Sequence, residues 1–180
     1  LSRMRATPTQ PNWNADGRPY RWQFDGHTVE LRIVDETGKV DLNKADLDLL
    51  QALLRALNVA PDKASRLAGA IVDWRDVDAL LQVSGGAETA DYQAAGMPYG
   101  AKNAPFDSIG ELQRVLGMEP ALYAQLAPLV TVYGSSRPSP RFAPAAVLTA
   151  MGMDAALIMA QREREDGAAG MGETSSTGGG

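Results

Sequence analysis

Cysteine is absent from this 180-residue chain, and histidine occurs only once, as His27. The lack of cysteine excludes disulfide bonds, thiolate zinc sites and cysteine nucleophiles together. A single histidine cannot build a histidine-based metal centre or complete a Ser-His-Asp triad within the chain. The commonest hydrolase and zinc chemistries are therefore largely excluded, and metal sites built from oxygen ligands are the kind that remains.

Long apolar runs and an excess of basic residues are lacking as well. No window holds the roughly 18 to 20 uninterrupted apolar residues that a membrane span needs. Acidic side chains (22) outnumber basic ones (17), and the net charge of −5 argues against general affinity for nucleic acid or anionic lipid. The apolar share of 44% is nevertheless enough to bury a core in one or two domains.

Residues 19–34 carry the clearest local signal. Two runs that alternate apolar and polar residues flank Asp25-Gly26, the preferred sequence of a two-residue type I′ hairpin turn. The loop length predicts the cross-strand pairs Phe24 with His27, Trp22 with Val29, Tyr20 with Leu31 and Arg21 with Glu30. An isolated hairpin is marginally stable, so we expect its apolar face to be covered, either by the helical domain or by a partner. A short strand at 40–42 is expected to cover one of its edges.

From residue 43 onward the apolar period becomes helical. The first helix carries a stripe of leucines between 49 and 57, and residues 129–133 are expected to form a short strand. Capping and proline signals predict the helix starts. These signals lie at Asn43, Pro61, Ser108 with Glu111, Pro120, Pro144 and Asp154.

A faint internal repeat links residues 43–53 with residues 141–151. Each stretch leads to a turn and a second amphipathic helix, so both resemble helix-hairpin-helix units. Such units usually bind phosphate through backbone N–H groups at Gly-rich turns. The first turn has no glycine and the second carries Asp154, so packing is the favoured interpretation. A helix-hairpin-helix nucleic-acid-binding protein is the alternative function.

Residues 73–91 are the candidate site for chemistry. Five carboxylates in this stretch repel one another unless water or a cation screens them. The stretch is therefore either a solvated acidic surface or an oxygen-ligand site for calcium. EF-hand spacing is absent, because Leu80 and Leu81 stand where that loop needs an oxygen ligand and a glycine. A metal-assisted hydrolase is a weaker alternative, since no base or nucleophile is evident outside the stretch. The five acids are Asp73, Asp76, Asp78, Glu88 and Asp91.

Several motifs in consistent order resemble the K subunit of bacterial type II secretion systems, the largest minor pseudopilin. They span roughly residues 18–165, and residues 141–143 depart from the pattern that the family often shows. The motifs are Asp-Glu-Thr-Gly-Lys-Val-Asp-Leu-Asn-Lys-Ala at 35–45, Asp-Trp-Arg-Asp-Val-Asp at 73–78, Gly-Ala-Glu at 86–88, Asp91-Tyr92, Tyr99 with Asn103, and Glu111-Leu112 with Gly117-Met118.

The resemblance implies an α+β fold, in which a small antiparallel pilin-like sheet, here the hairpin 19–34, carries a large inserted α-helical domain with helix-hairpin-helix-like units. It implies a non-enzymatic structural subunit at the tip of the pseudopilus that supports protein export across the outer membrane. Its expected partners are other minor pseudopilins and possible exported substrates, and no nucleic acid. The expected location is the periplasm, with inner-membrane anchoring only through an N-terminal helix outside this sequence.

The resemblance also implies calcium bound by Asp76, Asp78, Glu88 and Asp91, with Asp73 either a further ligand or only the end of the preceding helix. We accordingly expect the chain to be a fragment of a longer protein with four parts. These are a pilin-like β segment (1–42), an inserted helical domain with the acidic calcium loop (43–134), a second helical hairpin (135–166) and a flexible tail rich in Gly, Ala, Ser and Thr (167–180).

Overall fold

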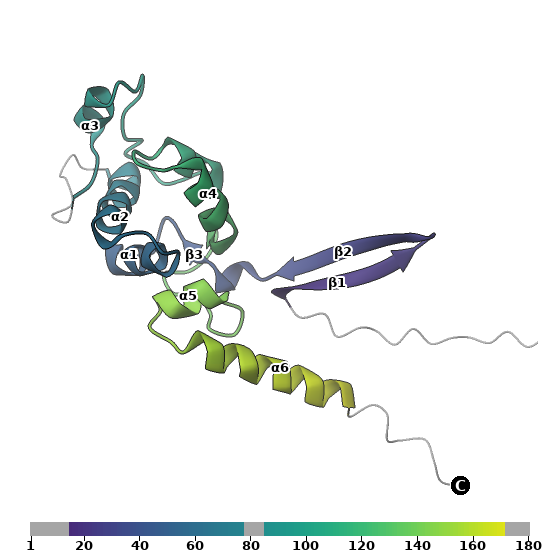
Figure 1. Cartoon of the computed structure of the whole chain (residues 1–180). Coiled ribbons are helices and arrows are strands. Elements are labelled where there is room, and N and C mark those ends of the chain that lie inside the picture. Colours follow the sequence, from purple (N-terminus) through teal and green to yellow (C-terminus); the bar gives the residue numbers. More distant parts are fainter. Residues whose placement is uncertain (1–14, 78–84, 172–180) are drawn as a thin grey trace, which may run out of the picture.

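A computed structural model describes residues 15–77 and 85–171 (Figure 1). It confirms the predicted α+β fold class, with a small antiparallel sheet and a helical region. In chain order the elements are β1 (Asp16–Phe24), β2 (His27–Val34), the 3-10 helix η1 (Glu36–Gly38), β3 (Val40–Asp41), α1 (Leu47–Ala56), α2 (Pro61–Arg75), α3 (Thr89–Ala94), η2 (Ile109–Arg114), α4 (Pro120–Leu126), η3 (Ala127–Leu129), β4 (Val130–Thr131), α5 (Ala145–Ala150) and α6 (Ala155–Met171).

The predicted hairpin and its register are confirmed. Strands β1 and β2 are antiparallel, and Trp22 lies opposite Val29 as the turn length requires. Asp25 and Gly26 have φ angles of 47° and 75°, the two positive values that a type I′ turn needs. Glu30 forms its ion pair with Arg32 on its own strand, over 2.8 Å, although Arg21 faces it across the hairpin.

The described helices do not cover the apolar face of the hairpin, so of the two expected covers, the helical domain and a partner, the first is not found. Figure 1 shows β1 and β2 projecting from the helical body, and the side chains of Trp22 and Phe24 are 58% and 65% exposed. The predicted edge contact at residues 40–42 is also wrong, because β3 pairs in parallel with β4 instead, with Val40 opposite Val130. Both valines are fully buried, so the short sheet belongs to the helical core.

The helical body is built around α1, which packs against both α2 and α5. The predicted leucine stripe of α1 faces the core, where Leu50, Leu53 and Leu54 are buried. The same core includes Val147 and Leu148 of α5, both fully buried, so it extends across the expected division at residues 134 and 135. The last helix runs to Met171, beyond residue 167, where the flexible tail was expected to begin.

The predicted cap at Asn43 is wrong. Helix α1 begins at Leu47, and its N-cap is Asp46, whose carboxylate accepts the Leu49 N–H over 2.8 Å. Asn43 instead bonds the backbone of Phe106, donating to its carbonyl at 3.0 Å and accepting its N–H at 2.7 Å. An asparagine amide can do this because it offers a donor and an acceptor side by side.

Arg75, at the end of α2, links the two helices of the first helical hairpin, α1 and α2. Its guanidinium donates to the carbonyl oxygens of Leu42 and Ala45, just before α1. The five donors of a guanidinium can satisfy two carbonyls at once, which suits a fork that bridges two backbone positions.

Arg162 on α6 makes the equivalent contacts in the second helical hairpin, formed by α5 and α6. It donates to the carbonyls of Pro140 and Ala143, the latter over 3.0 Å, and these two residues are spaced like the pair bonded by Arg75. In the turns, Asn58 and Gly152 take positive φ angles of 62° and 75°, and the following N–H bonds the carbonyl five residues earlier. The internal repeat is therefore a structural one.

Candidate functional site

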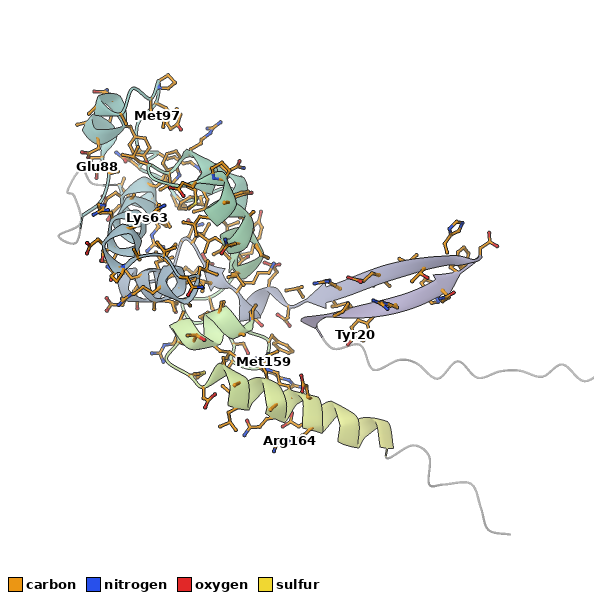
Figure 2. All side chains as sticks on the ribbon, in the orientation of Figure 1. Tyr20, Lys63, Glu88, Met97, Met159 and Arg164 are labelled. Carbon is orange, nitrogen blue, oxygen red and sulfur yellow. The ribbon has the colours of Figure 1, made fainter. Side chains whose placement is uncertain are left out.

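The predicted acidic residues fall on the end of α2 and on the segment that leads into α3. Asp73 lies in the last turn of α2 and is fully buried, and Asp76 follows the helix directly. Glu88 (Figure 2) is the N-cap of α3, and Asp91 lies in its first turn. Asp78, the fifth predicted ligand, lies outside the described residues.

Glycines on both sides bring the segment before α3 against α2. A Cβ on Gly86 would lie 1.8 Å from Asp73 Oδ2, and a Cβ on Gly69 would lie 1.6 Å from the carbonyl oxygen of Gly85. Any side chain at Gly69 or Gly86 would therefore clash. The close approach lets the Ala87 N–H donate to Asp73 Oδ2 over 2.9 Å.

Glu88 and Asp91 hold the first turn of α3 through a reciprocal capping box. Asp91 Oδ2 accepts the Glu88 N–H over 2.9 Å, and the Glu88 side chain accepts the Asp91 N–H. Glu88 is only 8% exposed, and it directly follows Ala87, which bonds Asp73. The fold thus places Asp73, Glu88 and Asp91 where α2 meets the start of α3.

Asp76 occupies a different environment from Asp73. Its Oδ1 accepts the neighbouring Val77 N–H over 2.8 Å. The residue also lines a pocket of about 200 Å³ together with Asn43, Arg75 and Pro105. Asp73, whose role as a ligand was left open in the sequence, lies against residues 86 and 87.

The described carboxylates do not complete a metal site by themselves. Within residues 15–77 and 85–171, no three Asp, Glu or His side chains are grouped so as to hold a metal ion. Calcium also accepts neutral amide and backbone oxygens. One such atom is Asn103 Oδ1, which is buried and has no hydrogen-bond partner in the described part of the chain. The donor types fit a hard cation, and sequence reasoning did not single out Asn103 as a candidate because it lies outside the acidic stretch.

Aromatic rings hold residues 99–106 against α2 and α3. Trp74 lies 5.9 Å from Tyr92, 6.4 Å from Tyr99 and 6.3 Å from Phe106, measured between ring centroids. Trp74 is buried and anchors this part of the core. The Tyr92 hydroxyl oxygen accepts the Leu116 N–H over 3.0 Å, and burial raises the pKa of Tyr92 to about 12.

Lys102 ties the same segment to η2. Its ammonium donates to the carbonyl of Pro105 at 2.7 Å, to Asp107 Oδ2 at 2.7 Å and to Glu111 Oε2 at 2.9 Å. Partial burial alone would raise the pKa of Glu111, but hydrogen bonds from Lys102, the Asp107 N–H and the Trp74 indole outweigh it and hold that pKa below its ordinary value. The predicted capping role of Glu111 is confirmed, and the contacts with Lys102 and Trp74 add to it.

The region that contains this site matches a known family. Residues 30–135, more than half of the chain, match the model of the family described as type II secretion system (T2SS), protein K. The chain belongs to this family. The family membership confirms the resemblance seen in the sequence. The match includes the acidic residues and Asn103, whereas α5 and α6 lie beyond it.

Two curated members of the protein K family are similar to the chain. The type II secretion system protein K of Pectobacterium carotovorum subsp. carotovorum is 29% identical over 134 residues, which cover 66% of this chain and 40% of that protein. The protein of the same name from Klebsiella pneumoniae is 29% identical over 143 residues, which cover 72% and 43%. The chain thus spans less than half the length of these relatives.

A solved structure shares the fold. The match is a chain of the GspK-GspI-GspJ complex from the type 2 secretion system of enterotoxigenic Escherichia coli, with a TM-score of 0.58 and 23% identity. The alignment covers 75% of this protein K chain and 52% of that one. Among the helices that the structure describes here, none is long and apolar enough to cross a membrane.

Proposed function

We propose that the chain is the periplasmic part of a minor pseudopilin, a structural and non-enzymatic subunit at the tip of the type II secretion pseudopilus. The observation that carries this proposal is the family match over residues 30–135. The solved structure with the same fold, a chain of a GspK-GspI-GspJ complex, supports other minor pseudopilins as partners. In this proposal inner-membrane anchoring is left to an N-terminal helix outside the present sequence. Contacts with exported proteins stay a prediction.

The hairpin is the surface that we assign to assembly with these partners. Trp22 and Phe24 are large apolar side chains, and both are more than half exposed. A two-stranded sheet of this kind is marginal without a third element against it. Its edges also present unpaired backbone groups to an additional strand. A partner subunit would supply both kinds of contact.

Size-exclusion chromatography with light scattering tests the proposal. The 180-residue chain is mixed with the purified periplasmic parts of the minor pseudopilins I and J from the same secretion system, and a stable complex is expected. Replacing Trp22 and Phe24 together by Ser should weaken the complex by about tenfold or more, since exposed aromatic residues are typical interface anchors. Tyr133→Ser is the matched control, because Tyr133 is 82% exposed but lies on the helical body.

No complex with the unaltered chain would contradict the proposed function. If the hairpin and control substitutions weakened the complex equally, only the assignment of the hairpin as the assembly surface would be contradicted.

We further propose that the junction of α2 and α3 binds calcium. The buried carboxylates of Asp73 and Glu88 support the proposal, with Asp91 beside them, and calcium prefers hard oxygen ligands of this kind. Asp76 and Asp78 stay predicted ligands. A bound ion would supply positive charge that offsets the repulsion among the acids.

Thermal unfolding of the chain in chelator and in millimolar calcium tests this site. Binding to the folded state alone would stabilise the chain by about 2.7 kcal/mol at a hundredfold excess over Kd. Magnesium should stabilise less, because it keeps its water and demands a tight octahedron. Glu88→Ala should abolish the response, whereas Asp46→Ala should cost about 0.5–2 kcal/mol as a lost helix cap and keep it. An identical melting temperature with and without calcium would contradict the site.

The nucleic-acid-binding alternative gains no support. Neither the family match nor the curated relatives point to it. In the second helical hairpin Asp154 caps α6, accepting the Leu157 N–H over 2.9 Å, so a carboxylate occupies the position where phosphate would bind.

A further inference from the structure

A pocket on the helical body lies between α2 and the turn that leads into α4. Its volume is about 430 Å³, within the range of about 300–1,000 Å³ that is usual for ligand pockets. None of the four described acids predicted to bind calcium lines it, and none of the hairpin residues does. The pocket is therefore separate from the assembly surface and from the acidic residues.

Helical periodicity places both positive charge and apolar side chains on the face of α2 that borders this pocket. Four of its residues follow the spacing i, i+3, i+4 and i+7, which puts them on one side of a helix. These residues are Lys63, Arg66, Leu67 and Ala70. Leu67 and Ala70 are buried, whereas Lys63 is half-buried and Arg66 is exposed. The pocket thus combines an apolar inner part with cations nearer to the solvent.

The remaining walls of the pocket are held in place by contacts of their own. The Leu116 N–H donates to the hydroxyl oxygen of the buried Tyr92 over 3.0 Å. The next residue, Gly117, turns the chain with a φ of 86°, and a Cβ there would lie 4.0 Å from Leu67 Cδ1. Ala87, in the segment before α3, borders the pocket on another side. Because its walls are fixed by the fold, the pocket needs little ordering when a ligand binds.

Arg66 is the cation of this pocket that the fold leaves unpaired. Within residues 15–77 and 85–171 its guanidinium forms no ion pair and no hydrogen bond, whereas Lys63 is paired with Glu119 over 2.6 Å. The stem of Arg66 packs along Gly85, where a Cβ would lie 3.2 Å from the arginine Cγ. An unpaired cation beside an apolar pocket, in a chain whose net charge is −5, favours an anionic ligand by charge complementarity.

The two parts of the pocket together select a carboxylate that is joined to an apolar group. A guanidinium binds a carboxylate through two parallel hydrogen bonds. A phosphate would bring more negative charge close to Glu119, and an inorganic anion would make no use of the apolar side chains of α2. A polypeptide offers both groups where an acidic residue precedes an apolar one.

We propose that this pocket binds an acidic and apolar segment of another polypeptide. The apolar side chain of that segment packs on Leu67 and Ala70, and the neighbouring carboxylate pairs with Arg66. The site requires neither calcium nor the hairpin surface, so it stands or falls separately from both.

Nuclear magnetic resonance titration of the isotope-labelled 180-residue chain tests the site with three defined peptides. Acetyl-Gly-Glu-Leu-Gly-amide carries both groups. In the second peptide glutamine replaces the glutamate, and in the third glycine replaces the leucine. Arg66→Gln removes the cation from the chain. Arg55→Gln is the matched control, because Arg55 is exposed on α1 and its loss changes the net charge equally.

The glutamate peptide should shift the amide signals of Ala70, Ala87 and Gly117 at millimolar concentration. The two peptides that lack the carboxylate or the leucine should bind about fivefold more weakly. Arg66→Gln should weaken binding of the glutamate peptide by the same factor and leave the glutamine peptide unaffected. Arg55→Gln should keep the affinities of the unaltered chain.

Three results would overturn the proposal. The first is the absence of these shifts in the unaltered chain at millimolar glutamate peptide. The second is an unchanged affinity of Arg66→Gln for that peptide. The third is an equal weakening of the glutamate and glutamine peptides by Arg66→Gln, which would mean that Arg66 supports the shape of the pocket and does not bind the carboxylate.

Discussion

Arg162 and Arg75 show how single side chains set the geometry of this fold. Each guanidinium satisfies two backbone carbonyls that precede the first helix of its hairpin. Hydrogen bonds with a charged donor are stronger than neutral ones, and partly buried carbonyls lose most when such a donor is removed. The two arginines therefore do the same structural work in both halves of the repeat.

Replacing Arg162 by Met should lower the free energy of unfolding by about 1–3 kcal/mol, because the carbonyls of Pro140 and Ala143 lose their donor. Arg164→Met is the control on the same helix, since Arg164 is exposed on α6 (Figure 2) and should contribute little. Urea unfolding measures both variants. Equal midpoints for the two would contradict the assigned role of Arg162.

Glu111 makes the stability of the folded chain depend on pH in the acidic range. Its pKa is held below the ordinary value of 4.5, so the folded state binds its proton less readily than the unfolded chain does. Its stabilising contribution is therefore complete above pH 4.5 and is lost as the pH falls through the folded-state pKa. Glu111→Gln should flatten the fall of stability below pH 4.5 in urea unfolding. The exposed Glu163→Gln should leave the original slope, and an unaltered slope in both would refute this account.

At the scale of elements, the packing of α2 on residues 85–88 depends on glycine at positions 69 and 86, because neither position has room for a side chain. In most helix interiors Gly→Ala stabilises by about 0.5–1 kcal/mol. At Gly69 the sign should reverse, because the added Cβ would lie 1.6 Å from the Gly85 carbonyl oxygen. The segment that carries Glu88 would then be displaced from α2.

Gly69→Ala should accordingly lower the melting temperature and weaken any calcium response, as measured by calorimetry. Gly110→Ala is the matched control, since a Cβ there would meet only Ser108 Oγ at 3.6 Å, an ordinary contact. A stabilising effect of Gly69→Ala would show that the segment before α3 does not pack on α2 as described.

Elements with strong local signals could be predicted from the sequence, whereas pairings between distant residues could not. The hairpin register follows from Asp25-Gly26, and α4 begins at Pro120 as expected. Asn43 and Asp46 are both good caps, and only the bond from Asn43 to Phe106, 63 positions away, decides between them. The pairing of β3 with β4 has no local signal at all.

The same distinction applies to the candidate site. The acidic residues could be identified from the sequence, but their relative positions depend on where α2 ends. Asp73 follows Gly69 by one helical turn and shares its buried face, whereas Asp76 lies past the end of α2. The periodicity could therefore have favoured Asp73. The buried oxygen of Asn103 required the fold itself.

At the scale of the whole molecule, the described chain is a packed helical body with an exposed hairpin projecting from it (Figure 1). The body buries its apolar side chains, while the hairpin leaves Trp22 and Phe24 in solvent. A subunit whose work is assembly would expose such a surface until its partners bind. In the proposed function, this hairpin is the surface that binds the other minor pseudopilins.

Amide hydrogen exchange of residues 16–34, with and without the minor pseudopilins I and J, tests whether the hairpin is the binding surface. In the isolated chain the hairpin should exchange faster than α1, α2 and α5, because few buried contacts hold it closed. Addition of the partners should slow exchange in β1 and β2 and leave the buried helices unchanged. Slow exchange in the isolated hairpin, unaltered by the partners, would show that the hairpin is not the surface they bind.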